Sequence, residues 1–205
     1  MARRGMLLTF EGVEGAGKST QIDLLADALM DRGRTVRVTR EPGGTAIGKE
    51  IRRLVMEARN PAPAPMTELL LYLADRAQHL AEVIRPALAA GDIVLCDRFS
   101  ASTIVYQGFA RSLDVELVTR LDELVRGGLK PDLTILLDCP VDLGLGRAQG
   151  SDRFHSEDVS FHERIRRGFA LLARQDPQRH LVVDAADDIP NVGSKILERV
   201  AELVG

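Results

Sequence analysis

The sequence has little of three features that would each point to a particular class of protein: long apolar runs, a basic excess, and cysteine. No apolar run approaches the length of a transmembrane helix, and the stretch 6–10 after the basic opening is too short for a signal-peptide core. We therefore expect a cytoplasmic protein without a membrane partner. The net charge of −3 argues against a nucleic-acid binder, but it leaves a small anionic substrate open.

Cysteine and histidine are too sparse to suggest redox or metal chemistry. Cys96 and Cys139 each end an apolar run and form no CxxC motif, and the four histidines show no metal-ligand spacing. We interpret both cysteines as small core residues. The 205 residues, 1–205, have the length of a single domain that can bury a sizeable core.

What the sequence does contain is an alternation of short apolar runs with helical patterns. The runs predict strands at 6–11, 35–40, 93–97, 133–138 and 180–184, and several are apolar almost throughout, as strands covered on both faces are. Helices are expected at 19–32, 66–90, 112–125, 161–174 and 189–204. This order predicts an α/β fold with a parallel sheet. The proline-rich stretch 60–65 is interpreted as a surface turn rather than a domain linker.

A glycine-rich loop, GVEGAGKS at 12–19, joins the first strand to the first helix. Its glycines permit a turn whose N–H groups point inward as an anion cradle, and the helix that follows adds unpaired N–H groups of its own. Lys18 would place its charge on the β- and γ-phosphates, and Ser19 would offer a hydroxyl to Mg²⁺. The loop predicts a nucleoside-triphosphate site, which fits a GTPase, an ATPase motor, a transporter subunit or a kinase.

Glu14 is unusual inside such a loop, because phosphate repels a carboxylate. Either Glu14 faces solvent, or it accepts a hydrogen bond from a hydroxyl group of a second substrate. The loop alone does not favour one over the other.

Further segments carry residues suited to anions or to a base. REPGGT at 40–45 places Arg40 at a turn, and Tyr72 and Arg76 share one helix face. Asp97 and Arg98 end the third strand, where open α/β sheets bind ligands. Plainer interpretations are an exposed turn, and a core tyrosine beside a salt-bridging arginine.

The segment 147–167 is rich in arginine. A solvated amphipathic helix explains several of them, in particular Arg164, Arg166 and Arg167. Arg147 and Arg153 instead flank a glycine-containing stretch.

Together, six segments that run in order along nearly the whole chain resemble bacterial thymidylate kinases. They are FEGVEGAGKST, REPGGT, YLADRAQH, DRFSASTIVYQG, ILLDCPVDLGLGR and DRFHSEDVSFHERIR. The resemblance implies a P-loop nucleoside monophosphate kinase fold: three α/β/α layers around a five-stranded parallel sheet in the order 2-3-1-4-5. It also implies transfer of the ATP γ-phosphoryl group to dTMP with Mg²⁺, as a step toward dTTP. A homodimer and a lid at about 147–158 are implied as well.

Motif by motif, the resemblance implies a role for each site residue. ATP would be bound by Gly12, Val13, Glu14, Gly15, Ala16, Gly17, Lys18, Ser19 and Thr20. The dTMP site would comprise Glu14, Arg40, Pro42, Tyr72, Arg76, Arg98, Ser102, Thr103, Tyr106 and Gln107. Mg²⁺ would be held by Ser19 and Asp97, directly or through water. The catalytic residues would be Lys18, Asp97, Arg98, Arg147 and Arg153.

Within the implied dTMP site, Glu14 would touch the 3′-hydroxyl, and Arg40 and Arg98 would lie near the phosphate. Tyr72 would stack on thymine where the family usually has phenylalanine, and Arg76 would donate to the thymine O4. Thr103 and Gln107 would approach the N3–H edge, and Tyr106 would lie against the deoxyribose. The Glu41–Pro42 peptide is expected to be cis. In the implied strand order Cys96 and Cys139 lie ~10 Å apart, so no disulfide is expected.

Phosphoryl transfer joins two anions, so a cation is needed at the transferring group itself. The loop holds no basic residue besides Lys18, which leaves Arg147 and Arg153 of the lid, and which of the two acts stays open. Rival interpretations are a kinase for another monophosphate or a deoxynucleoside, a P-loop switch that hydrolyses its nucleotide, and an inactive binding module. The switch would leave the pairs Tyr72/Arg76 and Thr103/Gln107 without a role.

Overall fold

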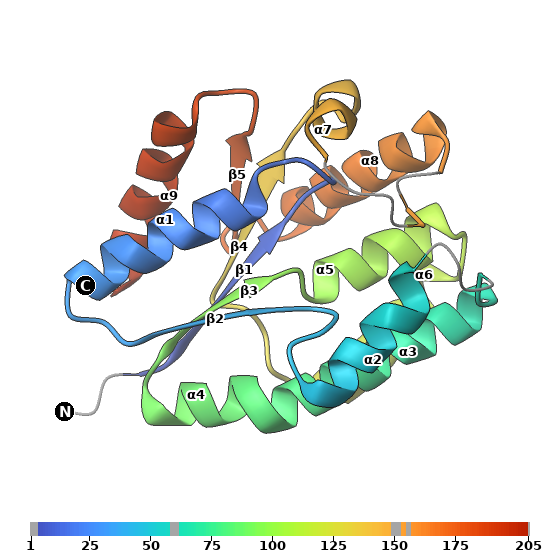
Figure 1. Ribbon diagram of the computed structural model, residues 1–205, viewed down its shortest axis with the longest axis horizontal. Coiled ribbons are helices and arrows are strands. Elements are labelled where there is room, and N and C mark those ends of the chain that lie inside the picture. The colour runs from blue at the N-terminus through green and yellow to red at the C-terminus, as the bar shows by residue number, and fades with distance from the viewer. Residues whose placement is uncertain (1–3, 58–61, 149–152, 155–156, 205) are drawn as a thin grey trace.

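The computed structural model describes residues 4–57, 62–148, 153–154 and 157–204, and it arranges them in three layers (Figure 1). The middle layer is a five-stranded parallel sheet in the order β2-β3-β1-β4-β5, which the resemblance implied. The strands are β1 (Met6–Glu11), β2 (Val36–Arg40), β3 (Ile93–Asp97), β4 (Leu133–Asp138) and β5 (His180–Asp184). All five predicted strands are confirmed, and β2 alone begins one residue late.

Helices cover both faces of the sheet. α1 (Lys18–Asp31) and α9 (Ile189–Val204) pack together on one face, while α4 (Arg85–Ala90) and α8 (Val159–Gln175) contact the sheet from the other (Figure 1). The remaining helices are α2 (Ala46–Met56), α3 (Pro65–His79), α5 (Ser100–Thr103), α6 (Val115–Arg126) and α7 (Val141–Arg147). In the part of the chain that the structure describes, no helix is both long and apolar enough to cross a membrane.

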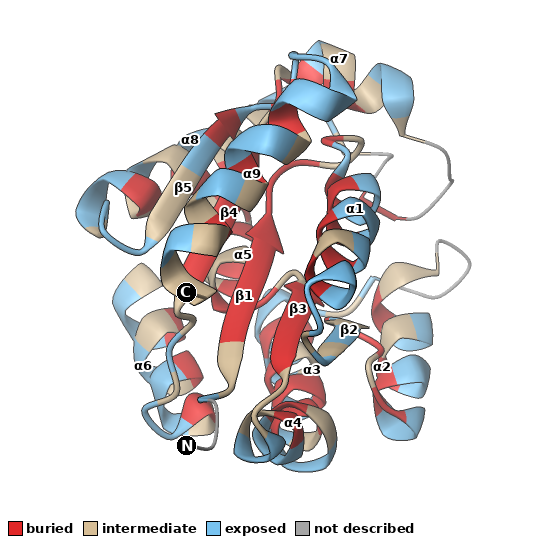
Figure 2. Ribbon diagram, turned by 90° about the vertical axis from the view of Figure 1, so that its left-hand side faces the viewer, coloured by how far each residue is buried: buried red, intermediate tan, exposed pale blue. Residues whose placement is uncertain are grey.

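The central strands are buried on both sides, as their apolar runs predicted (Figure 2). In β1, Leu8 and Phe10 join the larger core cluster, while Leu7 points to the opposite face and packs with Ile84 and Ala87. Strands β2 and β5 form the edges and are partly exposed. The carboxyl ends of β1 and β3, which carry the site, are therefore anchored in buried strands.

The predicted helix 66–90 is continuous but not uniform. Between α3 and α4 the residues Leu80–Ile84 form a π-helical turn, in which the Arg85 N–H donates to the Leu80 carbonyl oxygen. Pro86 follows in the first turn of α4 and has no N–H to donate. The wider turn lets the helix pass the proline without breaking.

Helix boundaries elsewhere follow from caps that the apolar pattern did not reveal. α6 begins three residues later than predicted, because the Asp114 side chain accepts hydrogen bonds from the N–H groups of Glu116 and Leu117. The hydroxyl of Thr45 caps α2 by accepting from the Gly48 N–H at 2.9 Å. After α5, residues Ile104–Ala110 form a second π-helical segment.

Helix α7, which the sequence did not predict, packs closely against the glycine-rich loop. Gly15 lies in the left-handed region with φ 68°, directly beside the backbone of Gly144. A Cβ atom on Gly144 would lie 2.6 Å from the carbonyl oxygen of Glu14. Two glycines therefore permit the contact between the loop and the helix.

Replacing Gly144 by alanine should displace the loop, because the added methyl group has no room. Overpacking of this kind costs ~1–3 kcal/mol, so we expect a lower free energy of unfolding in denaturant titrations and a weaker affinity for the nucleoside triphosphate that the loop motif predicts. Gly146→Ala is the matched control in the same helix, since nothing lies within 4 Å of a Cβ at that position. Equal losses in the two variants would contradict the packing argument.

Candidate functional site

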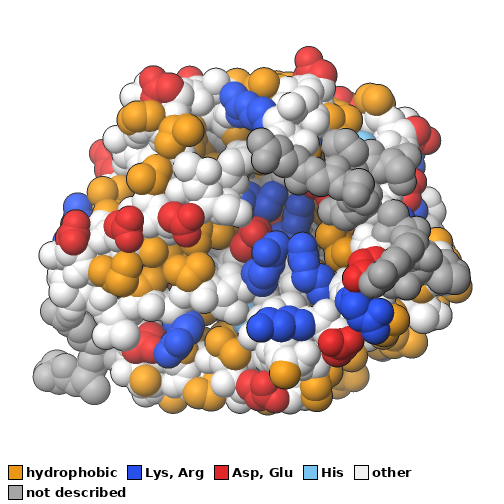
Figure 3. Space-filling view, in the orientation of Figure 1, with side chains coloured by type: hydrophobic (Ala, Val, Ile, Leu, Met, Phe, Trp, Pro, Cys, Tyr) orange, Lys and Arg blue, Asp and Glu red, His pale blue; other side chains and the backbone are white. Residues whose placement is uncertain are grey.

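A cleft of about 1060 Å³ opens at the carboxyl ends of the strands. Figure 3 shows lysine and arginine side chains gathered in this hollow. Most sequence-predicted site residues line it: Glu14, Gly15, Ala16, Gly17, Lys18, Ser19, Thr20, Arg40, Pro42, Tyr72, Arg76, Asp97, Arg98, Ser102, Thr103, Tyr106, Gln107 and Arg147. Gly12, Val13 and Arg153 are the predicted residues that do not line it.

The glycine-rich loop holds Lys18 against its own backbone. Gly17 adopts a left-handed conformation with φ 85°, which lets the chain turn directly into α1 and leaves the helix N-terminus facing the cleft. The Lys18 ammonium donates to the carbonyl oxygens of Gly12 at 3.2 Å and Val13 at 2.8 Å. Burial, aided by the charge of Arg98, lowers the pKa of Lys18 to about 7. A bound anion would restore the charged form.

Arg98 is fixed opposite the loop. Its backbone is in the left-handed region with φ 68°, uncommon for a residue with a side chain. Its Nη1 donates to the Gly12 carbonyl oxygen and to the Ser102 hydroxyl, both at 3.1 Å. The guanidinium lies 5.1 Å from the centre of the Tyr106 ring. Arg98 is therefore held ready for an anion between the loop and α5.

Glu11, which sequence reasoning missed, holds the turn that carries Arg98. It is fully buried, and its carboxylate accepts hydrogen bonds from the Phe99 N–H at 2.9 Å and the Ser102 hydroxyl at 2.5 Å. Burial raises the pKa of Glu11 to about 7. A carboxylate that ends an otherwise apolar strand, just before the loop, was the signal that could have found it.

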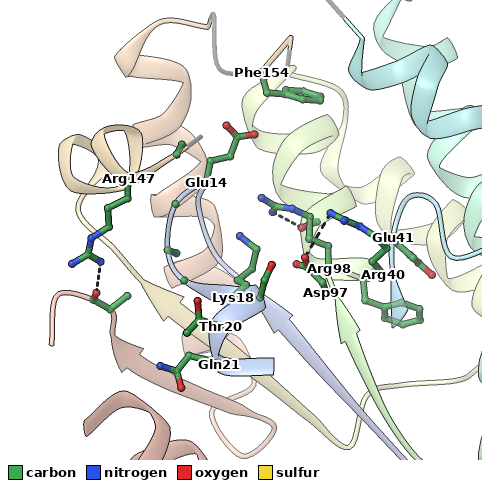
Figure 4. Close-up of a pocket in the computed structure, with 18 of the residues that line it drawn as sticks. Glu14, Lys18, Thr20, Gln21, Arg40, Glu41, Asp97, Arg98, Arg147 and Phe154 are labelled. Atoms are coloured by element: carbon green, nitrogen blue, oxygen red, sulfur yellow. Dashed lines mark hydrogen bonds and ion pairs between the residues drawn. The ribbon is translucent and has the colours of Figure 1, made fainter. Parts of the chain in front are cut away.

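Arg40 and Asp97 meet at the carboxyl ends of β2 and β3, where Nη2 of Arg40 lies 3.8 Å from Oδ2 of Asp97. Figure 4 shows both side chains beside Arg98, across the cleft from Lys18. The buried Oδ1 of Asp97 has no hydrogen-bond partner among the described residues. Ser19 lines the same cleft.

Arg76 is buried rather than on the surface, at 2% exposed. Its Nε and Nη2 donate to Glu41 at 2.8 and 2.7 Å, and its Nη1 donates to Asp122 at 2.5 Å. Glu41 also accepts from Nδ1 of His79, and the Glu41–Pro42 peptide is cis, as the resemblance implied. The REPGGT turn is thus joined to α3 and α6, which excludes the plainer interpretation of a merely exposed turn.

Tyr72 and Gln107 approach the same end of the cleft from α3 and the second π-helical segment. The Tyr72 hydroxyl donates to the Met56 sulfur at 3.7 Å, so the ring stands partly buried at the wall of the cleft. The Gln107 amide donates to Glu68 at 2.9 Å. A ring face and an amide therefore share this end of the cleft, as a base-binding site needs.

The two arginines assigned to the lid lie at different ends of the site. Arg147 ends α7, lines the cleft and donates to the carbonyl oxygen of Ala185 at 2.9 Å, on the side of the loop away from Arg98 (Figure 4). Arg153 is buried, and its Nη2 donates to Glu68 at 2.9 Å. Of the lid at about 147–158, residues 149–152 and 155–156 lie outside the described residues, as do residues 60–61 of the proline-rich turn.

Sequence reasoning also missed the segment 185–189, which follows β5 and lines the far end of the cleft with Val192 and Gln21. This segment carries no recognisable motif. Its position after the carboxyl end of a strand was the available signal, because such ends meet at one edge of the sheet.

A phosphate-binding loop after the first strand, facing a fixed arginine across one cleft at the carboxyl ends of a 2-3-1-4-5 sheet, defines a P-loop nucleotide kinase. Comparisons with known proteins narrow this class. The thymidylate kinase family model matches residues 10–196. The chain belongs to the thymidylate kinase family.

Individual relatives agree with the family model. The chain is 51% identical over 203 residues to the thymidylate kinase of Geobacter sulfurreducens, with 95% of each chain covered. It is 50% identical over 204 residues to that of Trichlorobacter lovleyi, covering 95% of this chain and 96% of the relative. Among solved structures, the crystal structure of thymidylate kinase from Ehrlichia chaffeensis is 32% identical with a TM-score of 0.82, covering 96% of this chain and 99% of that one.

Binding of ATP should draw a proton onto Lys18. Because the pKa of Lys18 is lowered to about 7, most free protein at pH 8 carries the neutral amine, and a bound triphosphate favours the charged one. Calorimetric titrations at pH 8, in buffers of different ionisation enthalpy, should show net proton uptake, up to about one proton per site. The uptake should fall toward pH 6, where free Lys18 is already protonated.

Lys18→Arg provides the control, because arginine stays protonated throughout this range. Any proton uptake that this variant retains comes from groups other than residue 18. A binding enthalpy for the unaltered protein that does not depend on the buffer at pH 8 would contradict the prediction.

Proposed function

We propose that this protein transfers the γ-phosphoryl group of ATP to dTMP, giving dTDP and ADP. One observation carries the proposal: the carbonyl oxygen of Gly12 accepts from both the Lys18 ammonium, at 3.2 Å, and the Arg98 guanidinium, at 3.1 Å. A cation suited to the donor phosphates and a cation suited to the acceptor phosphate thus lie within reach of one atom. Two phosphates bound to them would be neighbours, as in-line transfer requires.

The donor end is formed by the loop 12–20. Its N–H groups and the N-terminus of α1 would bind the phosphates of ATP, and Lys18 would leave the loop carbonyls for the β- and γ-phosphates. The remainder of the nucleotide would extend toward Arg147 and the segment 185–189, which line the cleft beyond the loop.

The acceptor end would hold dTMP with its phosphate at Arg98 and Arg40. The deoxyribose would lie against Tyr106, and the thymine would stack on Tyr72. Figure 4 shows Glu14 extending from the loop into the cleft, which favours contact with the 3′-hydroxyl over a solvent-facing position.

The edge of the thymine would be read by polar groups behind Tyr72. Thr103 and Gln107 are buried and line the cleft at this end, where they would face the N3–H. Arg76 lines the cleft as well. Its Nη1 donates one N–H to Asp122 and its Nη2 donates one N–H to Glu41. Each nitrogen has a second N–H, which would donate to the O4.

Mg²⁺ fits the residues present. The described residues contain no group of three histidine, cysteine or acidic side chains that could hold a metal. Mg²⁺ bound with a nucleotide, however, needs only one or two protein oxygens besides phosphates and water. The Ser19 hydroxyl and the unpartnered Oδ1 of Asp97 would hold it. When bound, Mg²⁺ neutralises charge on the donor phosphates.

The protein's own contribution to the reaction is to position and neutralise charge. Lys18 and Arg98 hold the two phosphates, and no general base is needed because the attacking phosphate oxygen is already anionic. The cation at the transferring group would come from Arg153 or Arg147. For Arg153 this requires that its guanidinium exchange Glu68 for the phosphoryl group, as the lid closes and excludes water.

A homodimer in the cytoplasm is the proposed state of the enzyme. Three helices that lie side by side each expose a pair of apolar residues at helical spacing, more than a single chain needs. The pairs are Ile47 and Leu54 in α2, Met66 and Leu70 in α3, and Leu117 and Leu124 in α6. Light scattering coupled to gel filtration should give twice the mass of one chain, and the mass of one chain would refute the dimer.

The function is tested by turnover with MgATP and a panel of acceptors. We expect ADP release with dTMP that greatly exceeds release without an acceptor, and a lower kcat/KM for dUMP than for dTMP. ADP release that does not depend on an acceptor would instead identify a P-loop switch. Efficient turnover of another monophosphate in place of dTMP would identify that monophosphate as the acceptor substrate.

Arg153→Ala should lower kcat on the order of 100-fold, with little change in the KM for dTMP, because a cation at the transferring group acts only in the transition state. Arg167→Ala, which removes an exposed arginine from α8, is the control and should leave both constants unchanged. If Arg153→Ala keeps its kcat while remaining folded, the assignment passes to Arg147.

A further inference from the structure

Glu68 lies directly behind the acceptor end of the cleft, in the first turn of α3, and is buried at 2% exposed. Its Oε1 accepts from Nε2 of Gln107 at 2.9 Å and from Nε of Arg111 at 3.4 Å. Its Oε2 accepts from Nη2 of Arg153 at 2.9 Å. Glu68 itself does not line the cleft. A carboxylate held by two guanidinium groups can only accept hydrogen bonds, and it cannot move to another position without losing them.

The contact with Glu68 decides which end of the Gln107 amide faces the cleft. A glutamine amide has a donor nitrogen and an acceptor oxygen of nearly equal size, so its partners set its orientation. Because the Gln107 Nε2 donates to Glu68, the Gln107 Oε1 points away from Glu68. Gln107 lines the cleft, and among the described residues nothing donates to Oε1. The oxygen is therefore the atom that remains for a ligand.

We propose that Glu68 is a positioning residue that determines specificity: by holding the Gln107 amide it makes this end of the cleft an acceptor, which selects pyrimidines that carry an N3–H. This inference rests on the function proposed above. Thymine and uracil donate from N3, whereas cytosine presents a lone pair there. Two acceptors facing each other in a buried site leave both unsatisfied, so cytosine nucleotides are rejected.

The cations at the phosphate end of the cleft, Lys18, Arg40 and Arg98, do not provide this discrimination, because dTMP, dUMP and dCMP share the phosphate. Arg76 would meet the base only at position 4, through the O4, and leaves the N3 edge to Gln107. The orientation of one amide does distinguish the bases. Glu68 is the described residue that the Gln107 nitrogen contacts.

Glu68→Gln tests the proposal with almost no change in shape. The new amide can donate to Gln107 as well as accept from it, so Gln107 becomes free to turn its nitrogen toward the ligand. The measurement is kcat/KM for dTMP, dUMP and dCMP in the unaltered enzyme and in the variant. We expect the ratio of dCMP to dTMP to rise on the order of tenfold or more. The ratio of dUMP to dTMP should not change, because both bases carry the N3–H.

Ratios of kcat/KM between acceptors separate a change in specificity from a general loss of activity. The variant also removes a charged partner of Arg153, which alters kcat for every acceptor but cancels between acceptors. An unchanged ratio of dCMP to dTMP in folded Glu68→Gln would make Glu68 merely structural and overturn the proposal. Arg111→Gln is the matched control: it removes one guanidinium from Glu68 but leaves the contact with Gln107, so its dCMP to dTMP ratio should stay at the value of the unaltered enzyme.

A second measurement needs no variant at residue 68. With ¹⁵N-labelled glutamine, assigned by comparison with Gln107→Ala, the Gln107 amide protons should exchange slowly with water both in the free protein and with dTMP bound. Loss of this protection on binding dTMP would show that the amide leaves Glu68, which overturns the proposal even if Glu68→Gln fails to fold. Failure of the unaltered enzyme to phosphorylate dTMP would instead refute the proposed function, and the exchange experiment on the free protein would still report on the contact.

Discussion

A buried cation at the wall of a cleft needs an acidic partner on its protein side. This requirement explains how most side chains of this site are held in place. Glu41 and Asp122 hold Arg76, and Glu11 holds the turn that carries Arg98. Glu68 holds the Gln107 amide at the cleft, and it also holds Arg153, which does not line the cleft. Leaving a buried charge without its partner costs about 3–5 kcal/mol. The side chains that face the ligand are therefore fixed from the side that the ligand never touches.

The strand order brings the two halves of the site together. Because β1 lies between β3 and β4, the last residues of β1 and β3 are neighbours, with Phe10 paired to Asp97. The Arg98 N–H donates to the Phe10 carbonyl oxygen at 2.9 Å, so the glycine-rich loop and Arg98 leave the sheet from adjacent points. Any sheet order that separated these strands would also separate Lys18 from Arg98, the two cations that the Gly12 carbonyl oxygen joins.

Much of this architecture can be predicted from the sequence, and the features that cannot be predicted have physical reasons. The central strands carry continuous apolar runs because both faces are covered, and the phosphate loop carries glycines because its backbone must turn toward the anion. The supporting carboxylates leave no such pattern. Glu68 looks like any acidic residue in the first turn of a helix, and Asp122 like a polar position on an amphipathic one. Only the three-dimensional structure shows that both are buried.

Helix boundaries were hardest to predict where tertiary contact outweighs local preference. Gly144 and Gly146 give α7 a low helix propensity, yet the helix forms because Gly144 lets it pack on the phosphate loop. The π-helical segment Leu80–Ile84 precedes a single proline, Pro86, and neither π-helical segment has a periodicity of its own. The roles of individual residues in the site came from the family resemblance, since spacing alone left several of them with two interpretations.

The π-helical segment Ile104–Ala110 also constrains the number of residues in the chain. It carries Tyr106 and Gln107 toward the cleft, while Val105 and Phe109 pack against Gly168 of α8. A π turn contains one more residue than an α turn, so a deletion here would restore α geometry and change the directions in which the side chains of this segment project. Substitutions in this segment can be compensated by neighbours, whereas a change in its length would carry the amide and the ring out of the site together. The geometry of this end of the cleft therefore depends on the length of the segment as well as on the identity of its residues.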